Sequence, residues 1–214
     1  MFKKLVLPVL FVAGAVFAVR GDDSEAIYRS AFAYSLAVPL SPSEFSDYWK
    51  VGGILTCSEE FDLVDEPVGG RVSIDIGWFS FNTDRFYKDF GKPANVSIDV
   101  SPTLLINVDV MLKWYLMTSP RIPYIIAGLG YASLFGGSYN IYSGSRLAYS
   151  GYGADNDALS FAIGAGADIP LSVFKVSAEV RYAGLIGVGG YTSYFPIRVG
   201  ISLPFSLIMS GKEE

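Results

Sequence analysis

Side chains able to perform catalysis are scarce in this chain of 214 residues, which contains no histidine. A Ser-His-Asp triad, a Cys-His pair and a metal centre built on histidine are therefore excluded. Cys57 is the single cysteine, so no intrachain disulfide can form, and we interpret it as a small packing residue. The sequence thus predicts a protein that is not an enzyme and that has no catalytic, cofactor or metal site.

Two short patterns resemble binding motifs, and each has a simpler interpretation. The G-x-G pairs at 128–130 and 164–166 lie inside strand-like segments with no helix after them, so close packing explains them better than a phosphate loop. The run Asp155-Asn156-Asp157 lacks the other ligands of a calcium loop and is interpreted as a solvated turn.

The more informative chemistry is a set of charged residues that recur at every second position of apolar segments. Lys175, Glu179 and Arg181, for example, share one face of a strand whose other face is apolar. The charged set is Arg29, Arg71, Asp75, Asp99, Asp109, Lys113, Asp168, Lys175, Glu179, Arg181 and Arg198. Its charges nearly cancel, which predicts a hydrogen-bonded ion-pair network, with a gated ion path as the alternative. The members assigned to this lumen network are Arg29, Asp75, Asp109, Lys113, Glu179, Arg181 and Arg198.

A second candidate site is the tyrosine-rich segment 136–157. Tyr139, Tyr142, Tyr149 and Tyr152 lie among Gly and Ser, with Arg146 between them. Tyr together with Ser and Gly is typical of adaptable binding loops, so these residues are candidate contacts for an unknown external ligand. The alternative is a long hairpin whose tyrosines only pack on one another.

Period-two alternation of apolar and polar residues predicts the elements that position these side chains. The clearest segment runs from Ser97 to Leu116, with a bend expected at Pro102. Seven further strands are predicted at about 28–38, 51–62, 71–82, 122–135, 158–170, 174–187 and 193–207. The second is the weakest, because Glu59, Glu60 and Asp62 leave a usable apolar face only between 51 and 57.

The composition of the two strand faces favours a membrane barrel. The chain is 51 % hydrophobic and 17 % charged, and past the N-terminus it has no apolar run long enough for a spanning helix. The polar face is filled mainly by Gly, Ala and Ser, which suit a narrow interior, and the apolar face of all strands but the second is uncharged. Longer and shorter connections alternate, which places the loops 39–50, 83–95, 136–157 and 188–192 outside. These features predict an all-β, eight-stranded antiparallel up-and-down transmembrane β-barrel; a soluble barrel with an apolar interior is the alternative.

The first residues have the layout of an export signal. Lys3 and Lys4 precede the apolar stretch 5–17, and small residues lead to a cleavage site after Ala18. We therefore expect a signal peptide at 1–18 and a single barrel domain at 19–214 of a bacterial outer membrane. The acidic balance, 21 Asp and Glu against 16 Lys and Arg, argues against a nucleic-acid partner.

Several phrases resemble the bacterial outer-membrane β-barrel domain family typified by the membrane part of outer membrane protein A. They are Pro123–Tyr131, Gly164–Pro170, Ala178–Tyr182 and Arg198–Ile201, with 39–50 similar to the stretch after that family's first strand. The resemblance covers about 28–207 and implies outer-membrane lipid, lipopolysaccharide and the outer-membrane assembly machinery as partners. Family members commonly end on an aromatic residue, whereas here Phe205 is followed by more chain. We expect the tail 208–214 to hang in the periplasm, or the assembly signal to be internal.

The leading functional hypothesis is a structural or surface-interaction role with a plugged lumen, in which the external loops form the interaction surface. The alternative is a narrow channel for small hydrophobic solutes. An apolar lining that continues to the external mouth would favour the channel, and a charged plug across the middle favours the first hypothesis.

Overall fold

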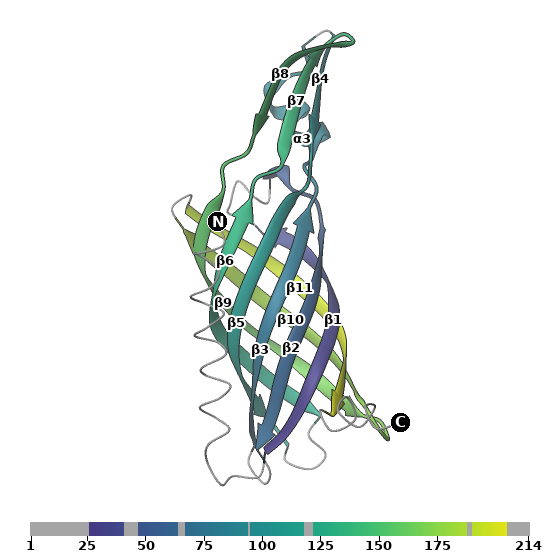
Figure 1. Ribbon diagram of the computed structural model, residues 1–214, viewed down its shortest axis with the longest axis vertical. Helices are drawn as coiled ribbons and strands as arrows, with labels where there is room; N and C mark the ends of the chain where they lie inside the picture. The colour runs from purple at the N-terminus through teal and green to yellow at the C-terminus, as the bar shows by residue number, and fades with distance from the viewer. Residues whose placement is uncertain are drawn as a thin grey trace, which may run out of the picture.

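The structure, a computed structural model, contains a closed barrel of eight antiparallel strands (Figure 1). It describes residues 26–40, 47–63, 67–93, 95–117, 122–187 and 190–204. The barrel strands are β1 (Ala26–Leu40), β2 (Gly52–Leu63), β3 (Val68–Phe79), β5 (Thr103–Tyr115), β6 (Pro123–Phe135), β9 (Asn156–Pro170), β10 (Lys175–Gly187) and β11 (Gly190–Pro204). Each is paired with its neighbours in chain order, so the predicted up-and-down barrel is confirmed.

The barrel closes where its first strand meets its last. The β1–β11 register runs from Arg29 opposite Pro204 to Leu40 opposite Ser193. On its other side β1 pairs with β2 along nearly its whole length. Every barrel strand therefore has two hydrogen-bonded neighbours, which satisfies the backbone where no water is present.

Alternation along the strands separates an apolar outer surface from a polar interior. Leu129 is 72 % exposed at the middle of β6, whereas Arg71 is completely buried inside. On the described barrel strands only Glu59 and Asp157 bring charge to the outer surface, toward opposite ends. A continuous exposed apolar surface suits lipid and not water, so the barrel is transmembrane and the soluble alternative is wrong. Cys57 is exposed on this surface, which corrects its interpretation as a small packing residue.

The predicted single strand 97–116 is wrong, because the chain breaks at residues 101–102 into two strands. β4 (Val96–Val100) leaves the barrel, and β5 begins at Thr103. The neighbouring strand β3 ends at Phe79, which is opposite Thr103, so earlier residues have no barrel partner on that side. Pro102 also lacks a backbone N–H for the ladder, which explains why the bend falls there.

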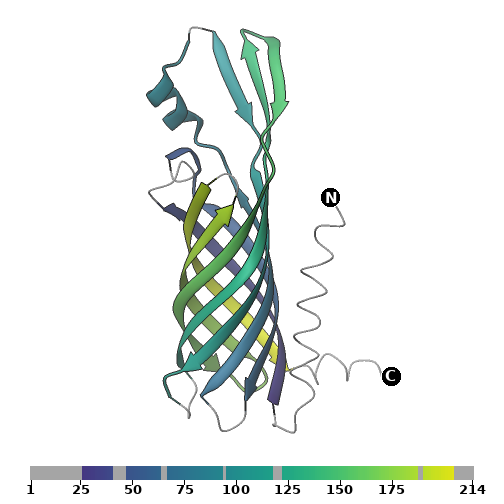
Figure 2. The ribbon, with the colours of Figure 1, turned by 90° about the vertical axis from the view of Figure 1, so that its left-hand side faces the viewer.

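A second, three-stranded sheet rises from one end of the barrel, here called the upper end; the lower end is where β1 begins (Figure 2). It consists of β4, β7 (Ser138–Ser143) and β8 (Arg146–Tyr152), with β7 in the centre. The predicted loop 136–157 is therefore mostly a β-hairpin. Its turn contains Gly144 with a positive φ of 62°, and the Gly144 N–H donates to the Asn95 carbonyl at 2.6 Å.

The predicted connection 83–95 contains a short helix, α3 (Thr83–Phe90). The Asn82 side chain caps it by accepting from the backbone N–H of Arg85. Tyr87 of α3 lies against β4, where its hydroxyl accepts from the backbone N–H of Ile98 at 2.7 Å. Among the residues described, no helix is both long and apolar enough to cross a membrane.

The second strand, predicted at about 51–62 as the weakest of the eight, is present at Gly52–Leu63. The signal peptide predicted at 1–18, Phe205 and the tail 208–214 lie outside the described residues.

Candidate functional site

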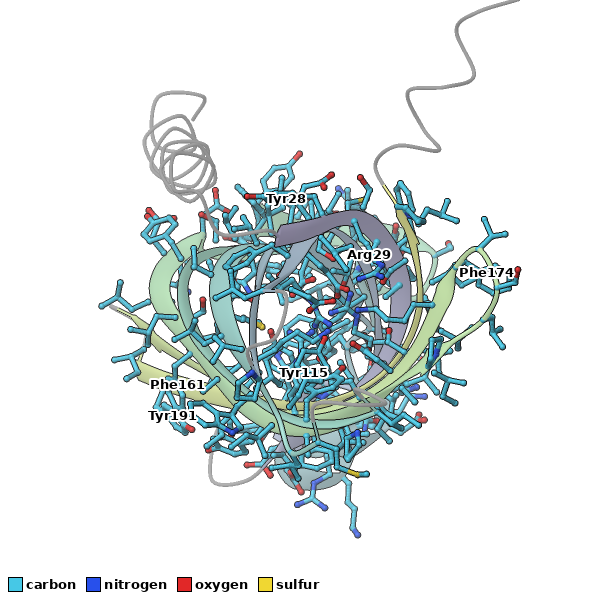
Figure 3. The ribbon with its side chains drawn as sticks, turned by 90° about the horizontal axis from the view of Figure 1, so that it is seen from below. Tyr28, Arg29, Tyr115, Phe161, Phe174 and Tyr191 are labelled. Carbon is cyan, nitrogen blue, oxygen red and sulfur yellow. The ribbon has the colours of Figure 1, made fainter. Side chains whose placement is uncertain are left out.

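The lower half of the lumen contains a continuous ion-pair network, visible from below in Figure 3. One of its centres is Glu60 of β2, which is 1 % exposed. Its carboxylate lies 2.8 Å from Arg71 Nη2, 3.0 Å from Lys175 Nζ and 3.7 Å from Lys113 Nζ. The Ser202 hydroxyl donates to the same carboxylate at 3.1 Å. Glu60 thus joins side chains from β3, β5, β10 and β11.

A second centre is Glu179 of β10. Arg71 Nη1 donates to it at 2.9 Å, and the Tyr124 hydroxyl donates at 2.7 Å. Arg181 Nε also donates to this carboxylate. Arg71 therefore connects Glu60 and Glu179, so the two carboxylates share one guanidinium.

The network continues to Asp62 and Asp168 near the lower end. Lys113 Nζ lies 2.8 Å from Asp168, and Arg29 Nη1 lies 2.9 Å from Asp62. The Tyr115 hydroxyl lies 2.7 Å from Asp62 and 2.9 Å from Asp168. The Tyr115 hydroxyl therefore connects Asp62 with Asp168, and Asp168 is connected to Glu60 through Lys113.

Charge in the lumen balances completely in the described barrel. Six acidic residues are buried, and five buried basic residues are joined by Arg29, which is paired with Asp62. Buried charges are tolerated when they are paired and hydrogen-bonded, whereas loss of one partner exposes the other to the full cost of burial. The arrangement can hold side chains rigidly across the lumen.

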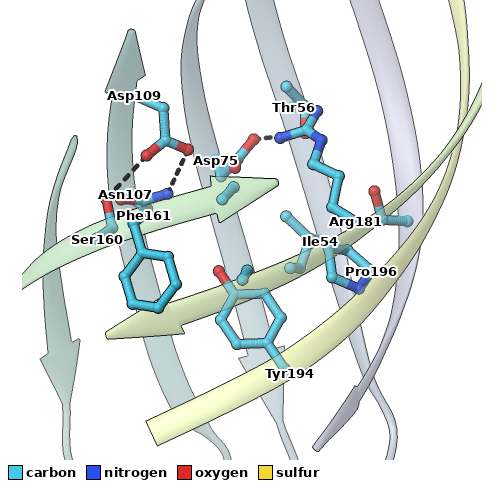
Figure 4. Close-up of a pocket in the computed structure, with 13 residues that line it drawn as sticks. Ile54, Thr56, Asp75, Asn107, Asp109, Ser160, Phe161, Arg181, Tyr194 and Pro196 are labelled. Carbon is cyan, nitrogen blue, oxygen red and sulfur yellow. Dashed lines mark hydrogen bonds between the residues drawn. The ribbon is translucent and has the colours of Figure 1, made fainter. Parts of the chain in front are cut away.

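Asp75 and Asp109 lie above this network and form no ion pair within 4 Å in the described residues (Figure 4). The Thr56 hydroxyl donates to Asp75 at 2.6 Å. Asp109 accepts from Asn107 Nδ2 at 2.6 Å and from the Ser160 hydroxyl at 2.8 Å. Neutral donors therefore hold these two carboxylates.

Buried apolar side chains form a layer in the lumen above the two carboxylates. Each of its side chains is at most 3 % exposed; they are Ile54, Phe79, Leu105, Leu185 and Tyr194. The rings of Phe79 and Tyr194 meet edge to face with centroids 5.9 Å apart. The small cavity between this layer and the carboxylates has room for about one water molecule.

The sequence analysis missed two charged members of the network, as well as the hydroxyl groups of Tyr115, Tyr124 and Ser202, and misplaced one charged residue. The seven residues assigned to the lumen all face it, as do Arg71, Asp168 and Lys175. Glu60 and Asp62 were placed in the second strand as residues that weaken its apolar face and were not assigned to the lumen, yet they lie on the same inward face as Thr56 and Ser58. Asp99 was predicted to face the lumen, but it lies exposed on β4 outside the barrel.

The five residues predicted as loop contacts lie on the two opposite faces of the upper sheet. Tyr139 and Tyr149 stack on one face of the upper sheet with ring centroids 5.9 Å apart. Their hydrogen bond raises the pKa of the Tyr139 hydroxyl above its usual value. Tyr142 and Tyr152 have cross-strand partners on the opposite face, and Arg146 pairs with Ser143 at the hairpin tip. The alternative in which the tyrosines only pack on one another therefore fits Tyr139 and Tyr149. It does not fit Tyr142 and Tyr152.

Comparisons with known proteins give structural neighbours only. No family model and no curated protein sequence matches the chain. The attachment invasion locus protein Ail of Yersinia pestis has 14 % identity and a TM-score of 0.49, over 86 % of this chain and all of that one. The N-terminal β-barrel domain of Pseudomonas aeruginosa OprF has 12 % identity and a TM-score of 0.47, over 84 % of this chain and all of that one. A major outer membrane protein of Thermus thermophilus has 12 % identity and a TM-score of 0.48, over 85 % of this chain and all of that one.

Proposed function

We propose that this chain is a non-catalytic, non-conducting barrel of a bacterial outer membrane, and that its upper sheet is an interaction surface on the outside of the cell. The barrel lies in outer-membrane lipid and lipopolysaccharide, after removal of residues 1–18 and insertion by the outer-membrane assembly machinery. The observation that carries the proposal is the projection of β4, β7 and β8 beyond the barrel rim (Figure 2).

The projecting sheet has features of a binding element. It is ordered by backbone pairing, so its side chains are held in place before any partner arrives, which lowers the entropy cost of binding. Leu147, Tyr149 and Tyr152 are 51 %, 56 % and 83 % exposed. Large exposed aromatic and aliphatic side chains on a projecting sheet are typical of a surface that contacts other molecules.

The layered lumen supports a barrel that passes no solute. Ion pairs cross its lower half, and tightly packed apolar side chains such as Phe79 and Leu105 occupy its upper half. A channel for hydrophobic solutes, the alternative function, needs open space lined by apolar groups. The apolar layer is instead filled by its own side chains.

Deletion of residues 138–152 tests the interaction role. The ends left behind are already adjacent, because the Gly153 N–H donates to the Gly137 carbonyl at 2.9 Å, so the joined chain needs little rearrangement. We expect the shortened protein to keep its heat-modifiable migration and to lose attachment to host cells or to other bacteria. Attachment equal to that of the full chain, at equal surface amount, would contradict the proposal.

Planar-bilayer recordings test the closed lumen. The purified full chain should show no large, steady conductance, and vesicles containing it should not take up small hydrophobic dyes faster than empty vesicles. Steady conductance or faster dye entry would instead support the channel alternative.

A further inference from the structure

The two faces of the upper sheet differ in chemistry, and the strand register assigns each side chain to one of them. Residues directly opposite in an antiparallel pair lie on the same face. Ile98, Ile141 and Tyr149 are opposite one another across the three strands. This face, called here the apolar face, is mostly apolar; its larger side chains are Val96, Ile98, Val100, Tyr139, Ile141 and Tyr149, and Ser143 and Arg146 follow at the hairpin tip.

The other face, called here the polar face, has a polar centre between two tyrosines. Asp99, Asn140 and Ser150 are opposite one another and form a row across all three strands. Tyr142 lies two residues from this row toward the hairpin tip, and Tyr152, opposite Ser138, lies two residues from it toward the barrel. At about 3.4 Å per residue, the two tyrosines are separated by roughly 14 Å along the strands.

The side chains of the central row are free to bind. Within the described part of the chain, Asp99, Asn140 and Ser150 make no side-chain hydrogen bond or ion pair. Asp99 and Ser150 are exposed and Asn140 is half-buried. A carboxylate, an amide and a hydroxyl together offer both acceptors and donors, which is what a row of sugar hydroxyl groups requires.

The flanking tyrosines suit the other part of a sugar. One face of a pyranose ring presents C–H groups, which pack against the electron-rich face of an aromatic ring. Tyr152 is 83 % exposed, and Tyr142 is half-buried beside Leu147, which faces the same side. Rings at two separated places fit a chain of sugars better than a single one.

The charge on the polar face disfavours anionic partners. Asp99 is the only charged side chain on the polar face, so sulfated or acidic glycans and nucleic acids would be repelled. The centre of the face is the uncharged amide of Asn140 on the central strand β7, with Asp99 beside it on the edge strand β4, so hydrogen-bonding groups and not a large apolar side chain occupy the centre. The apolar face has the composition expected for protein contact.

We propose that the polar face binds a neutral glycan chain, with Tyr142 and Tyr152 as stacking platforms and with Asp99 and Asn140 as the hydrogen-bonding groups. This inference rests on the proposed surface-interaction function and names the chemical class of its partner.

Isothermal titration of the full chain in lipid nanodiscs tests the inference, with maltohexaose, cellohexaose and chitohexaose as neutral probes and heparin as the anionic comparison. We expect at least one neutral probe to bind and heparin to bind more weakly than that probe. Tyr142→Ala and Asp99→Asn should each weaken binding at least tenfold. Tyr149→Ala, a tyrosine on the opposite face, should change it less than twofold, and all three variants should keep heat-modifiable migration.

Three results would overturn the glycan assignment: no neutral probe binds at millimolar concentration, heparin binds more tightly, or Tyr149→Ala weakens binding as much as Tyr142→Ala. A protein partner would give attachment that the 138–152 deletion removes and that the neutral probes do not inhibit. That pattern rejects the glycan and leaves the surface-interaction function intact. Attachment that survives the deletion rejects the function itself.

Discussion

Arg71 Nη1 lies 2.9 Å from one carboxylate oxygen of Glu179 and 3.2 Å from the other, although 108 positions separate the two residues in the chain. β3, which carries Arg71, and β10, which carries Glu179, are not neighbours around the barrel. The contact therefore crosses the lumen and connects two walls that share no backbone hydrogen bond. Both side chains are completely buried.

Removal of the Arg71 charge should destabilise the barrel strongly. In Arg71→Met, both Glu60 and Glu179 lose a buried partner, and breaking such a pair costs about 3–5 kcal/mol. The measurement is the free energy of unfolding in urea, in lipid vesicles. Arg85→Met is the matched control, because Arg85 pairs with Asp89 on the exposed helix α3 and should contribute at most about 1 kcal/mol. Equal losses in the two variants would show that the buried network does not stabilise the fold.

A charge on the outer surface of the barrel should be costly only within the lipid. Leu129 lies 72 % exposed at the middle of β6, so Leu129→Arg should reduce the free energy of unfolding by about 2–4 kcal/mol. Leu147→Arg, on β8 of the upper sheet, replaces the same residue type in water and should change it by about 0.5 kcal/mol or less. The prediction fails if Leu129→Arg is tolerated as well as Leu147→Arg in vesicle unfolding.

Cys57 reports directly on lipid contact. It is exposed in the structure but lies on the outer barrel surface, with Phe32 and Ile74 as its cross-strand neighbours. A water-soluble maleimide should therefore leave the thiol unmodified in intact vesicles and modify it after unfolding. Ser150→Cys in a Cys57→Ser background places the only thiol on β8 and should be modified at once. Rapid modification of Cys57 in vesicles would contradict a transmembrane β2.

Tyr139 should ionise at a higher pH than a free tyrosine. The hydrogen bond with Tyr149 holds the proton on the neutral phenol, which raises the pKa of Tyr139 in the folded chain. The stabilisation from this bond is complete below the unfolded pKa of about 10 and is lost as the pH rises through the folded value. Tyr149→Phe removes the partner, so the Tyr139 pKa should fall back toward 10. Carbon-13 NMR titration of the labelled tyrosine ring measures this, and an unchanged midpoint in Tyr149→Phe would contradict the assignment.

The amino-acid sequence by itself determined the barrel and its two faces. Alternation is a local property, so Leu129 outside and Glu179 inside follow from parity alone once one face is known to meet lipid. The absence of histidine likewise limits the possible chemistry through composition alone. Neither conclusion depends on which distant segments of the chain come together.

The inward placement of Glu60 and Asp62 needed the tertiary structure. In sequence they follow Glu59 and form an unsupported acidic run that a membrane strand should avoid. Their cations, Arg71, Lys113, Lys175 and Arg29, arrive from other strands through pairing across the barrel. Buried carboxylates are favourable only when such cations pair with them. The pairing is not visible in the local sequence, where the two carboxylates would only weaken a membrane strand.

The upper sheet likewise depended on register. Pro102 indicates a bend in the 97–116 segment, but the alternation continues on both sides of it, so the sequence does not show that Asp99 lies outside the barrel. Asp99 lies outside the barrel because β3 ends opposite Thr103, so residues before Thr103 have no barrel strand to pair with on that side. In the hairpin, the register shift between Ile141 and Tyr142 places Leu147 opposite Tyr142, on the face of Tyr152, although parity along β8 would put Leu147 on the face of Tyr149. The sequence determined which residues alternate, and the tertiary structure decided which of them meet, because hydrogen-bond register joins segments that are distant in the chain.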